Sequence, residues 1–232
     1  MAIDGRLVDL SQPLGPGAVL WPGTKPVATH PVSSIESDGS YARRIDTPEH
    51  AGTHLDAPAH FITDGMTTDR IPAERLVVEG ALLDVADRCA ENPDFVLEAA
   101  DLEELERRDG EIAEGSAVLL RTGWEAHLAD PGRYLGGSAE EDLHFPGFAE
   151  SAARLLIGRG VVGIGSDTVS VDAGNATGFP VHHTTLPAGL WHLEGLVSLA
   201  ELPPRGFTLF VGALALVDGS GSPARVLALV QG

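Results

Sequence analysis

Apolar residues fall into short runs along this chain, separated by segments rich in glycine and proline. A short continuous apolar run is typical of a strand buried on both faces, whereas strict alternation is typical of a strand with one face in water. The last two apolar runs are separated by 218–222 (DGSGS), which predicts a hairpin-like turn. We expect strands at 6–10, 79–85, 116–122, 161–165, 207–217 and 224–230.

Two segments have the patterns of helices. In 101–108, Asp101 is in position to act as the N-cap, and Glu104 follows three residues later as in a capping box. In 146–159, alanine, leucine and isoleucine residues form a broad apolar face. Segments rich in glycine, proline or acidic residues predict loops at 11–26, 130–146 and 172–178.

Strands that alternate with few helices predict a layered α/β domain with a mixed, partly barrel-like sheet. The chain shows no internal repeat, low-complexity tract or linker between its apolar regions. Its 232 residues are enough for one large domain. We therefore expect a single domain over residues 1–232.

In one stretch, from 50 to 60, every imidazole and the carboxylate fall at even positions. Its odd positions are small or apolar, and in an extended chain alternate side chains share one face. Gly52 and Pro58 argue against a helix here. The even positions include three imidazoles and a carboxylate, those of His50, His54, Asp56 and His60.

A straight strand would not bring all four of these groups together. At roughly 3.3 Å per residue, positions 50 and 60 would lie about 33 Å apart. The ligands of one zinc-sized ion lie about 2.0–2.2 Å from it, and therefore within about 4 Å of each other. We expect bends at Gly52 and at the step 56–58, which would make this segment a metal-binding loop running off a strand.

Net charge and composition exclude several classes of partner and of metal site. The formal charge of −19 disfavours a nucleic acid or an anionic membrane as partner, because both require a cationic face. No apolar run approaches about 18 residues, and no basic region followed by an apolar run opens the chain, so we expect a cytoplasmic protein.

Cys89 is the only cysteine and has no activating base beside it in sequence, which indicates a structural thiol. Imidazoles and carboxylates without thiolates suit Zn²⁺ or Mn²⁺.

The pattern His50-x-Gly52-Thr53-His54-x-Asp56-x-Pro58-x-His60 resembles the signature of the cyclase family of metal-dependent hydrolases. That family includes bacterial kynurenine formamidases and isatin hydrolases, and the likeness extends through nearly the whole chain. The resemblance implies a sheet–sheet–helix fold of the swivelling β/β/α type. It also implies a homodimer or a homotetramer.

The same resemblance implies that His182 and Glu194 complete the metal site, with Gly189 between them at a turn. Carried over residue by residue, it gives a site of one or two ions. One ion would be held by His50, His54, Asp56 and Glu194. A second would be held by Asp56, His182 and Glu194, with the two carboxylates bridging.

These residues predict a metal that activates water and polarises a carbonyl group, and the resemblance implies that the bond hydrolysed is an amide. His60 remains after the ligands are assigned and titrates in a useful range, so we expect it to act as general acid/base. Trp21 is expected to stack on a flat substrate, although it could instead cap the core. The resemblance implies a small amide substrate, an aryl formamide such as N-formylkynurenine. The alternatives are ring opening of a cyclic amide such as isatin and, from a different class, a non-catalytic metal-containing binding protein.

Four further polar residues are left with open roles. Asp167 and Asp172 follow directly on a predicted strand, and we favour support of a ligand histidine over direct metal binding. His183 and His192 do not fit the carried-over ligand pattern and are expected at ordinary polar positions near the pocket, with contact to substrate left open. The family often has an arginine where His183 stands, so the substrate also stays open.

Overall fold

The computed structural model describes residues 4–231. Its main sheet has eight strands, and an additional pairing between the second and the eighth strand in spatial order closes seven of them into a barrel. In spatial order the strands are β1 (Arg6–Asp9), β12 (Gly221–Val230), β11 (Phe207–Ala213), β5 (Val77–Asp84), β7 (Ala117–Arg121), β9 (Gly163–Ser166), β10 (Trp191–Glu194) and β4 (His54–Asp56).

The barrel is closed by β4, which pairs with both β10 and β12. Neighbours along the path β5-β7-β9-β10 are parallel, and all other pairs in the sheet are antiparallel. β1 lies outside the closed ring, against β12. The predicted α/β fold with a mixed, partly barrel-like sheet is therefore confirmed.

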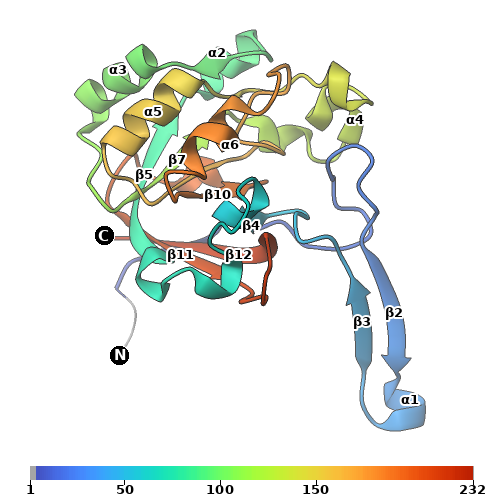
Figure 1. Cartoon of the computed structure of the whole chain (residues 1–232). Helices are drawn as coiled ribbons and strands as arrows, with labels where there is room; N and C mark the ends of the chain where they lie inside the picture. Colours follow the sequence, from blue (N-terminus) through green and yellow to red (C-terminus); the bar gives the residue numbers. More distant parts are fainter. Residues whose placement is uncertain (1–3, 232) are drawn as a thin grey trace.

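Four helices cover one side of the sheet: α2 (Ala86–Glu91), α3 (Ala99–Asp109), α5 (Glu150–Gly158) and α6 (Pro180–Thr185) (Figure 1). The short strands β6 (Val96–Leu97) and β8 (Gly147–Phe148) form a separate two-stranded sheet beside them. A fifth helix, α4 (Pro131–Leu135), lies in the segment predicted as a loop. Single 3₁₀ turns occupy Pro58–His60, Thr68–Arg70, Ala73–Arg75, Trp124–His127, Glu140–Asp142 and Leu199–Glu201.

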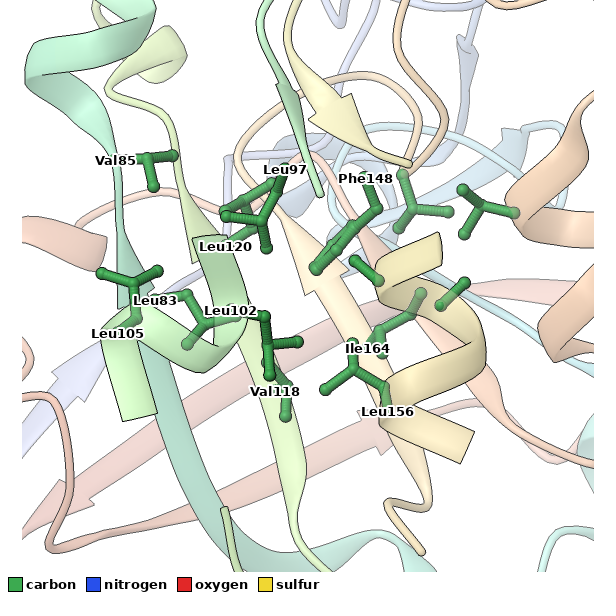
Figure 2. Close-up of a cluster of buried hydrophobic side chains, with 14 of the residues drawn as sticks. Leu83, Val85, Leu97, Leu102, Leu105, Val118, Leu120, Phe148, Leu156 and Ile164 are labelled. Atoms are coloured by element: carbon green, nitrogen blue, oxygen red, sulfur yellow. The ribbon is translucent and has the colours of Figure 1, made fainter. Parts of the chain in front are cut away.

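The buried strands separate two apolar layers. In β7, Val118 and Leu120 face the helices, while Ala117 and Leu119 face the interior of the barrel. Figure 2 shows the helix-facing layer, where Val118 and Leu120 lie near Leu102 of α3. Because both faces of these strands are covered, their sequences read as continuous apolar runs rather than alternating ones.

Several boundaries differ from the predictions. The N-cap of α3 is Glu98, so the assignment of that role to Asp101 was wrong; Asp101 stands three residues later and completes the capping box. α5 begins at Glu150 because Gly147–Phe148 pairs with β6. The strand predicted over 207–217 ends at Ala213.

An arm that the apolar pattern did not predict extends from the body (Figure 1). It consists of β2 (Ala28–Ser33), the single-turn helix α1 (Ile35–Asp38) and β3 (Ala42–Asp46). β2 and β3 pair only with each other. Few of the arm residues are apolar, and most are exposed, so the arm contains no continuous apolar run that would predict a buried strand.

No helix within residues 4–231 is both long enough and apolar enough to cross a bilayer. The expectation of one domain over 1–232 stays a prediction.

Candidate metal centre

The centre is built on the pairing between β4 and β10. Their antiparallel register places His54 opposite Glu194 and Asp56 opposite His192. Directly opposed residues in such a pair project from the same face of the sheet. Between them, Leu55 and Leu193 project from the other face into the barrel core. Alternation thus lets one strand pair supply both a packed core and a polar floor.

A third element adds another imidazole. His182 lies in α6, and its Nδ1 is 2.6 Å from Asp172 Oδ2. The carboxylate of Asp172 also accepts hydrogen bonds from the backbone amides of Val181 and His182 in the first turn of the helix. Asp172 therefore fixes both the start of α6 and the orientation of the His182 ring, which agrees with the expected supporting role.

The other ring nitrogen of His182 faces the strand pair. His182 Nε2 lies 3.4 Å from Asp56 Oδ2 and 3.5 Å from Glu194 Oε1. On the other side, His54 Nε2 lies 3.3 Å from Asp56 Oδ1 and 3.3 Å from Glu194 Oε2. Each carboxylate thus presents one oxygen to each imidazole, an arrangement that suits two neighbouring ions as well as one.

These four distances are long for hydrogen bonds, which for N–H···O are about 2.7–3.2 Å. They match the separation between ligand atoms that each lie about 2.0–2.2 Å from one ion in tetrahedral geometry. All four side chains are buried. The spacing therefore fits a cation between the side chains better than it fits direct pairing among them.

An unpartnered oxygen supports the same fit. Asp56 Oδ2 is buried and has no hydrogen-bond partner within residues 4–231. Burial opposes ionisation of this carboxyl, yet the neighbouring His54 holds the pKa of Asp56 well below its usual range. A buried, ionised oxygen without a proton donor costs several kcal/mol unless a cation balances it. The residues present therefore fit a divalent metal ion.

The ring of His54 is turned toward the centre by its backbone neighbour. His54 Nδ1 lies 3.0 Å from the carbonyl oxygen of Gly52, so Nδ1–H donates there and Nε2 is left free to face the carboxylates. Gly52 has a φ of +61°, a conformation that favours glycine, and it makes the bend expected at this position.

His50 lies in the loop before β4. Its Nδ1 is 2.6 Å from Asp56 Oδ1, and its Nε2 is 3.0 Å from Ser220 Oγ. The ring packs against Gly221, where an added Cβ would lie only 2.4 Å from His50 Cε1. Space for this imidazole therefore depends on a glycine about 170 residues further along the chain.

His60 follows in a 3₁₀ turn, and its ring stacks on that of His50 with centroids 3.9 Å apart. The backbone turn thus brings residues 50 and 60 together, which a straight strand could not do. Loss of solvation lowers the pKa of His60 to about 4, with the charge of Asp56 opposing this shift. The ring is accordingly neutral at neutral pH, and its pKa lies below the near-neutral range expected from the sequence.

A cavity of about 300 Å³ opens above these groups. His50, His54, His60, His182 and Glu194 line its floor. Its walls are mostly apolar and include Val19, Leu20, Trp21, Pro48, Val169 and Phe179.

Trp21 lies in this wall, in edge contact with Phe145 and 5.5 Å from the ring of Phe179 between centroids. Phe179 precedes Pro180 in a left-handed conformation, with a φ of +50°. This strained backbone places an aromatic ring beside both Trp21 and His182. A pocket with metal-ligating groups below and aromatic rings around suits a small, flat substrate.

Sequence reasoning missed two members of this site. Phe179 was not singled out, and no local signal marks it. His192 was assigned an ordinary polar position, but it is fully buried and faces Asp56 Oδ2 at 3.8 Å. The sequence does contain a signal for His192, because His192-Leu193-Glu194 repeats the polar–apolar–polar alternation of His54-Leu55-Asp56.

Asp167 and His183, whose roles the sequence left undecided, lie outside the metal centre. Asp167 is buried and accepts hydrogen bonds from the backbone and hydroxyl of Thr122 and from the backbone of Trp124, so it supports the wall rather than the floor. Burial raises the pKa of Asp167 to about 6. His183 is exposed and contacts Phe61.

Comparison with known proteins agrees with the geometry. The Cyclase family model, described as "Putative cyclase", matches residues 8–173. The chain is 34% identical to an isatin hydrolase from Roseibium aggregatum, over 97% of this chain and 92% of the relative. It is 30% identical to a kynurenine formamidase from Salinibacter ruber, over 95% of this chain and 96% of the relative. A crystal structure of an isatin hydrolase bound to the product analogue thioisatinate superposes with a TM-score of 0.93 at 32% identity, covering 99% of this chain and 94% of that one.

Proposed function

The chain belongs to the Cyclase family, and from this premise we propose that it is a metal-dependent hydrolase that cleaves the carbon–nitrogen bond of an aromatic amide. The observation that carries the proposal is the set of imidazoles and carboxylates, spaced 3.3–3.5 Å apart, at the floor of an aromatic pocket.

The metal would be held by the side chains of His50, His54, Asp56, His182 and Glu194, as one ion or two. Zn²⁺ and Mn²⁺ suit this donor set of nitrogen and oxygen without sulfur. When bound, such an ion polarises a carbonyl group and makes water a stronger acid.

His60 is the group proposed to move the proton. Its ring lines the cavity, makes no hydrogen bond within residues 4–231, and is neutral at neutral pH. A neutral imidazole accepts a proton from the attacking water and returns it to the amide nitrogen as the C–N bond breaks. The stack on His50 holds the ring beside the floor during both transfers.

Trp21 and Phe179 would bind the aromatic part of the substrate. Their rings lie in the wall above the floor, where they exclude water and offer flat surfaces for stacking. The carbonyl group of a stacked substrate would then face His54 and His60.

Two substrate classes share this chemistry. One is an aryl formamide such as N-formylkynurenine, supported by the similarity to kynurenine formamidases. The other is a cyclic aryl amide such as isatin, supported by the similarity to isatin hydrolases and by a specific feature of the pocket. The pocket lining includes no lysine or arginine among the described residues, so the amino-acid carboxylate of N-formylkynurenine has no cationic partner there.

Both substrates should be tested with the same preparation. We expect the purified chain, stripped with a chelator and reloaded with Mn²⁺ or Zn²⁺, to hydrolyse at least one of N-formylkynurenine and isatin, and the stripped protein to be inactive. Equal rates before and after chelation would contradict the metal-dependent reaction. Metal binding without turnover of any amide would instead favour the non-catalytic binding protein.

A further inference from the structure

The two strands at the floor of the pocket carry the same short pattern. His54-Leu55-Asp56 and His192-Leu193-Glu194 each consist of histidine, leucine and a carboxylate. Their antiparallel register pairs the histidine of each strand with the carboxylate of the other. A local twofold relation therefore makes His192 the counterpart of His54, just as Glu194 is the counterpart of Asp56.

The protons of the His192 ring can be assigned from its neighbours. The hydroxyl of Thr185 lies 2.7 Å from the carbonyl oxygen of Val181 and donates its single proton there. The same hydroxyl lies 2.7 Å from His192 Nε2 and must therefore accept from it. Nε2 carries the proton of a neutral ring, so Nδ1 is an unprotonated lone pair.

This lone pair points into the centre. His192 Nδ1 lies 3.8 Å from Asp56 Oδ2, and neither atom has a hydrogen-bond partner in the described part of the chain. The side chain of His192 is fully buried. Two buried acceptors that face each other with no proton between them are unfavourable, and a cation between them would remove this cost.

We propose that His192 is an additional metal ligand, binding through Nδ1 together with Asp56, His182 and Glu194. This inference rests on the proposed metal centre and adds a residue that the family pattern does not assign. One ligand atom from each of the four side chains lies within 4.8 Å of every other. Ligand atoms about 2.0–2.2 Å from a tetrahedral ion lie about 3.3–3.6 Å apart, and the 3.8 Å between His192 Nδ1 and Asp56 Oδ2 requires only a small side-chain adjustment to fit.

Metal binding tests the proposal without any use of activity. His192→Phe keeps the bulk of the ring and removes both nitrogens. We expect the variant, stripped and titrated with Zn²⁺ in competition with a chromophoric chelator, to lose one ion per chain or to bind about tenfold or more weakly. With Co²⁺ in place of Zn²⁺, the visible absorption spectrum should change because an imidazole leaves the coordination sphere.

Two further variants keep the result interpretable. His183→Phe alters the neighbouring exposed histidine and should leave affinity, stoichiometry and the Co²⁺ spectrum as in the wild type. Thr185→Val removes the acceptor of Nε2–H while keeping the shape of the side chain, and should weaken binding without removing the imidazole signal. If His192→Phe fails to fold, this variant still tests the assignment, because an unchanged affinity would overturn it.

Wild-type affinity, stoichiometry and Co²⁺ spectrum in a folded His192→Phe protein would also overturn the proposal. That outcome is distinct from failure of the whole centre, in which the wild type itself would bind neither Zn²⁺ nor Co²⁺.

Discussion

At the scale of single residues, the pattern of 50–60 and the family resemblance predicted most of the groups that meet, but not how each is oriented. His50, His54, Asp56 and His60 converge as their alternation and bends required, and His182 and Glu194 join them from distant segments. Orientation depends on contacts that no local pattern reveals, such as the carbonyl oxygen of Gly52 on His54 and the hydroxyl of Thr185 on His192. The roles of these residues as ligands stay a prediction.

His60 and Asp56 should separate catalysis from metal binding. His60→Ala removes the proposed proton carrier and leaves the ligands, so we expect kcat to fall by about 10²–10⁴-fold with metal content unchanged. Asp56→Ala removes the carboxylate that faces both His54 and His182, so metal and activity should be lost together. Metal analysis beside steady-state kinetics checks both variants, and loss of metal from His60→Ala would make His60 a ligand instead.

Cys89 should be inert in the folded protein. It is buried, and burial raises the pKa of its thiol to about 12, so the reactive thiolate is scarce below that pH. We expect no labelling by iodoacetamide at pH 8 in buffer. Complete labelling should follow in strong denaturant, where the thiol returns to a pKa of about 8.5. Rapid labelling of the native protein, followed by mass spectrometry, would show that the Cys89 thiol is accessible and reactive in the folded state.

At the scale of elements, most strands of the barrel were predicted, because burial on both faces gives them a simple apolar signature. The elements that carry the site residues were harder to predict from the sequence. β4 has three residues and β10 has four, and α6 is a helix of six residues that begins at a proline. Such short elements are stabilised by tertiary contacts rather than by their own propensity, so only the alternation of their polar side chains marks β4 and β10 in the sequence.

Asp172 should be essential to α6. Asp172→Ala removes hydrogen bonds to the backbone of Val181 and His182 and to the ring of His182. We expect a loss of about 1–3 kcal/mol in unfolding free energy and about 10–100-fold in metal affinity. Asp87→Ala, at an exposed position in α2, provides the matched control and should change neither quantity. Unaltered metal affinity in Asp172→Ala would remove Asp172 from its supporting role.

Gly221 should be required for the position of His50. An added Cβ would lie 2.4–2.9 Å from three atoms of the imidazole, so Gly221→Ala must displace the ring or the strand. We expect a loss of about 1–3 kcal/mol in unfolding free energy, measured by denaturant titration, together with weaker metal binding. Gly158→Ala, in α5 with no atom within 4 Å of the added Cβ, should be neutral or slightly stabilising. If Gly221→Ala matched that control, the close packing around His50 would be refuted.

At the scale of the whole molecule, the arm is the feature least explained by a single chain. An isolated two-stranded hairpin is marginally stable in water. Segment 25–46 also carries as many basic as acidic residues in a chain of charge −19, so it can approach an acidic surface without repulsion. Between 56% and 71% of the surface of its large apolar side chains is exposed, at Val32, Ile35, Tyr41 and Ile45.

We expect a second copy of this chain to cover the arm, in agreement with the homodimer or homotetramer predicted from the resemblance. The segments that lead into and out of the arm, with Trp21 before it and Pro48 after it, line the pocket, so this contact would also steady the pocket wall. The double variant Ile35→Ser with Ile45→Ser should shift the assembly toward monomer in analytical ultracentrifugation. Val217→Ser, at a body position that is 80% exposed, is the control and should leave the assembly unchanged. A monomeric wild type would contradict this expectation.

The central claim is that β4, β10 and α6 together hold a divalent cation. Anomalous diffraction from crystals grown with Mn²⁺ or Zn²⁺, recorded at the absorption edge of the metal, tests it most directly. We predict a strong peak bounded by His54, Asp56, His182 and Glu194, within about 2.0–2.2 Å of their nitrogen and oxygen atoms. A well-ordered site with no peak there, while the metal is present in the crystal at saturating concentration, would contradict it.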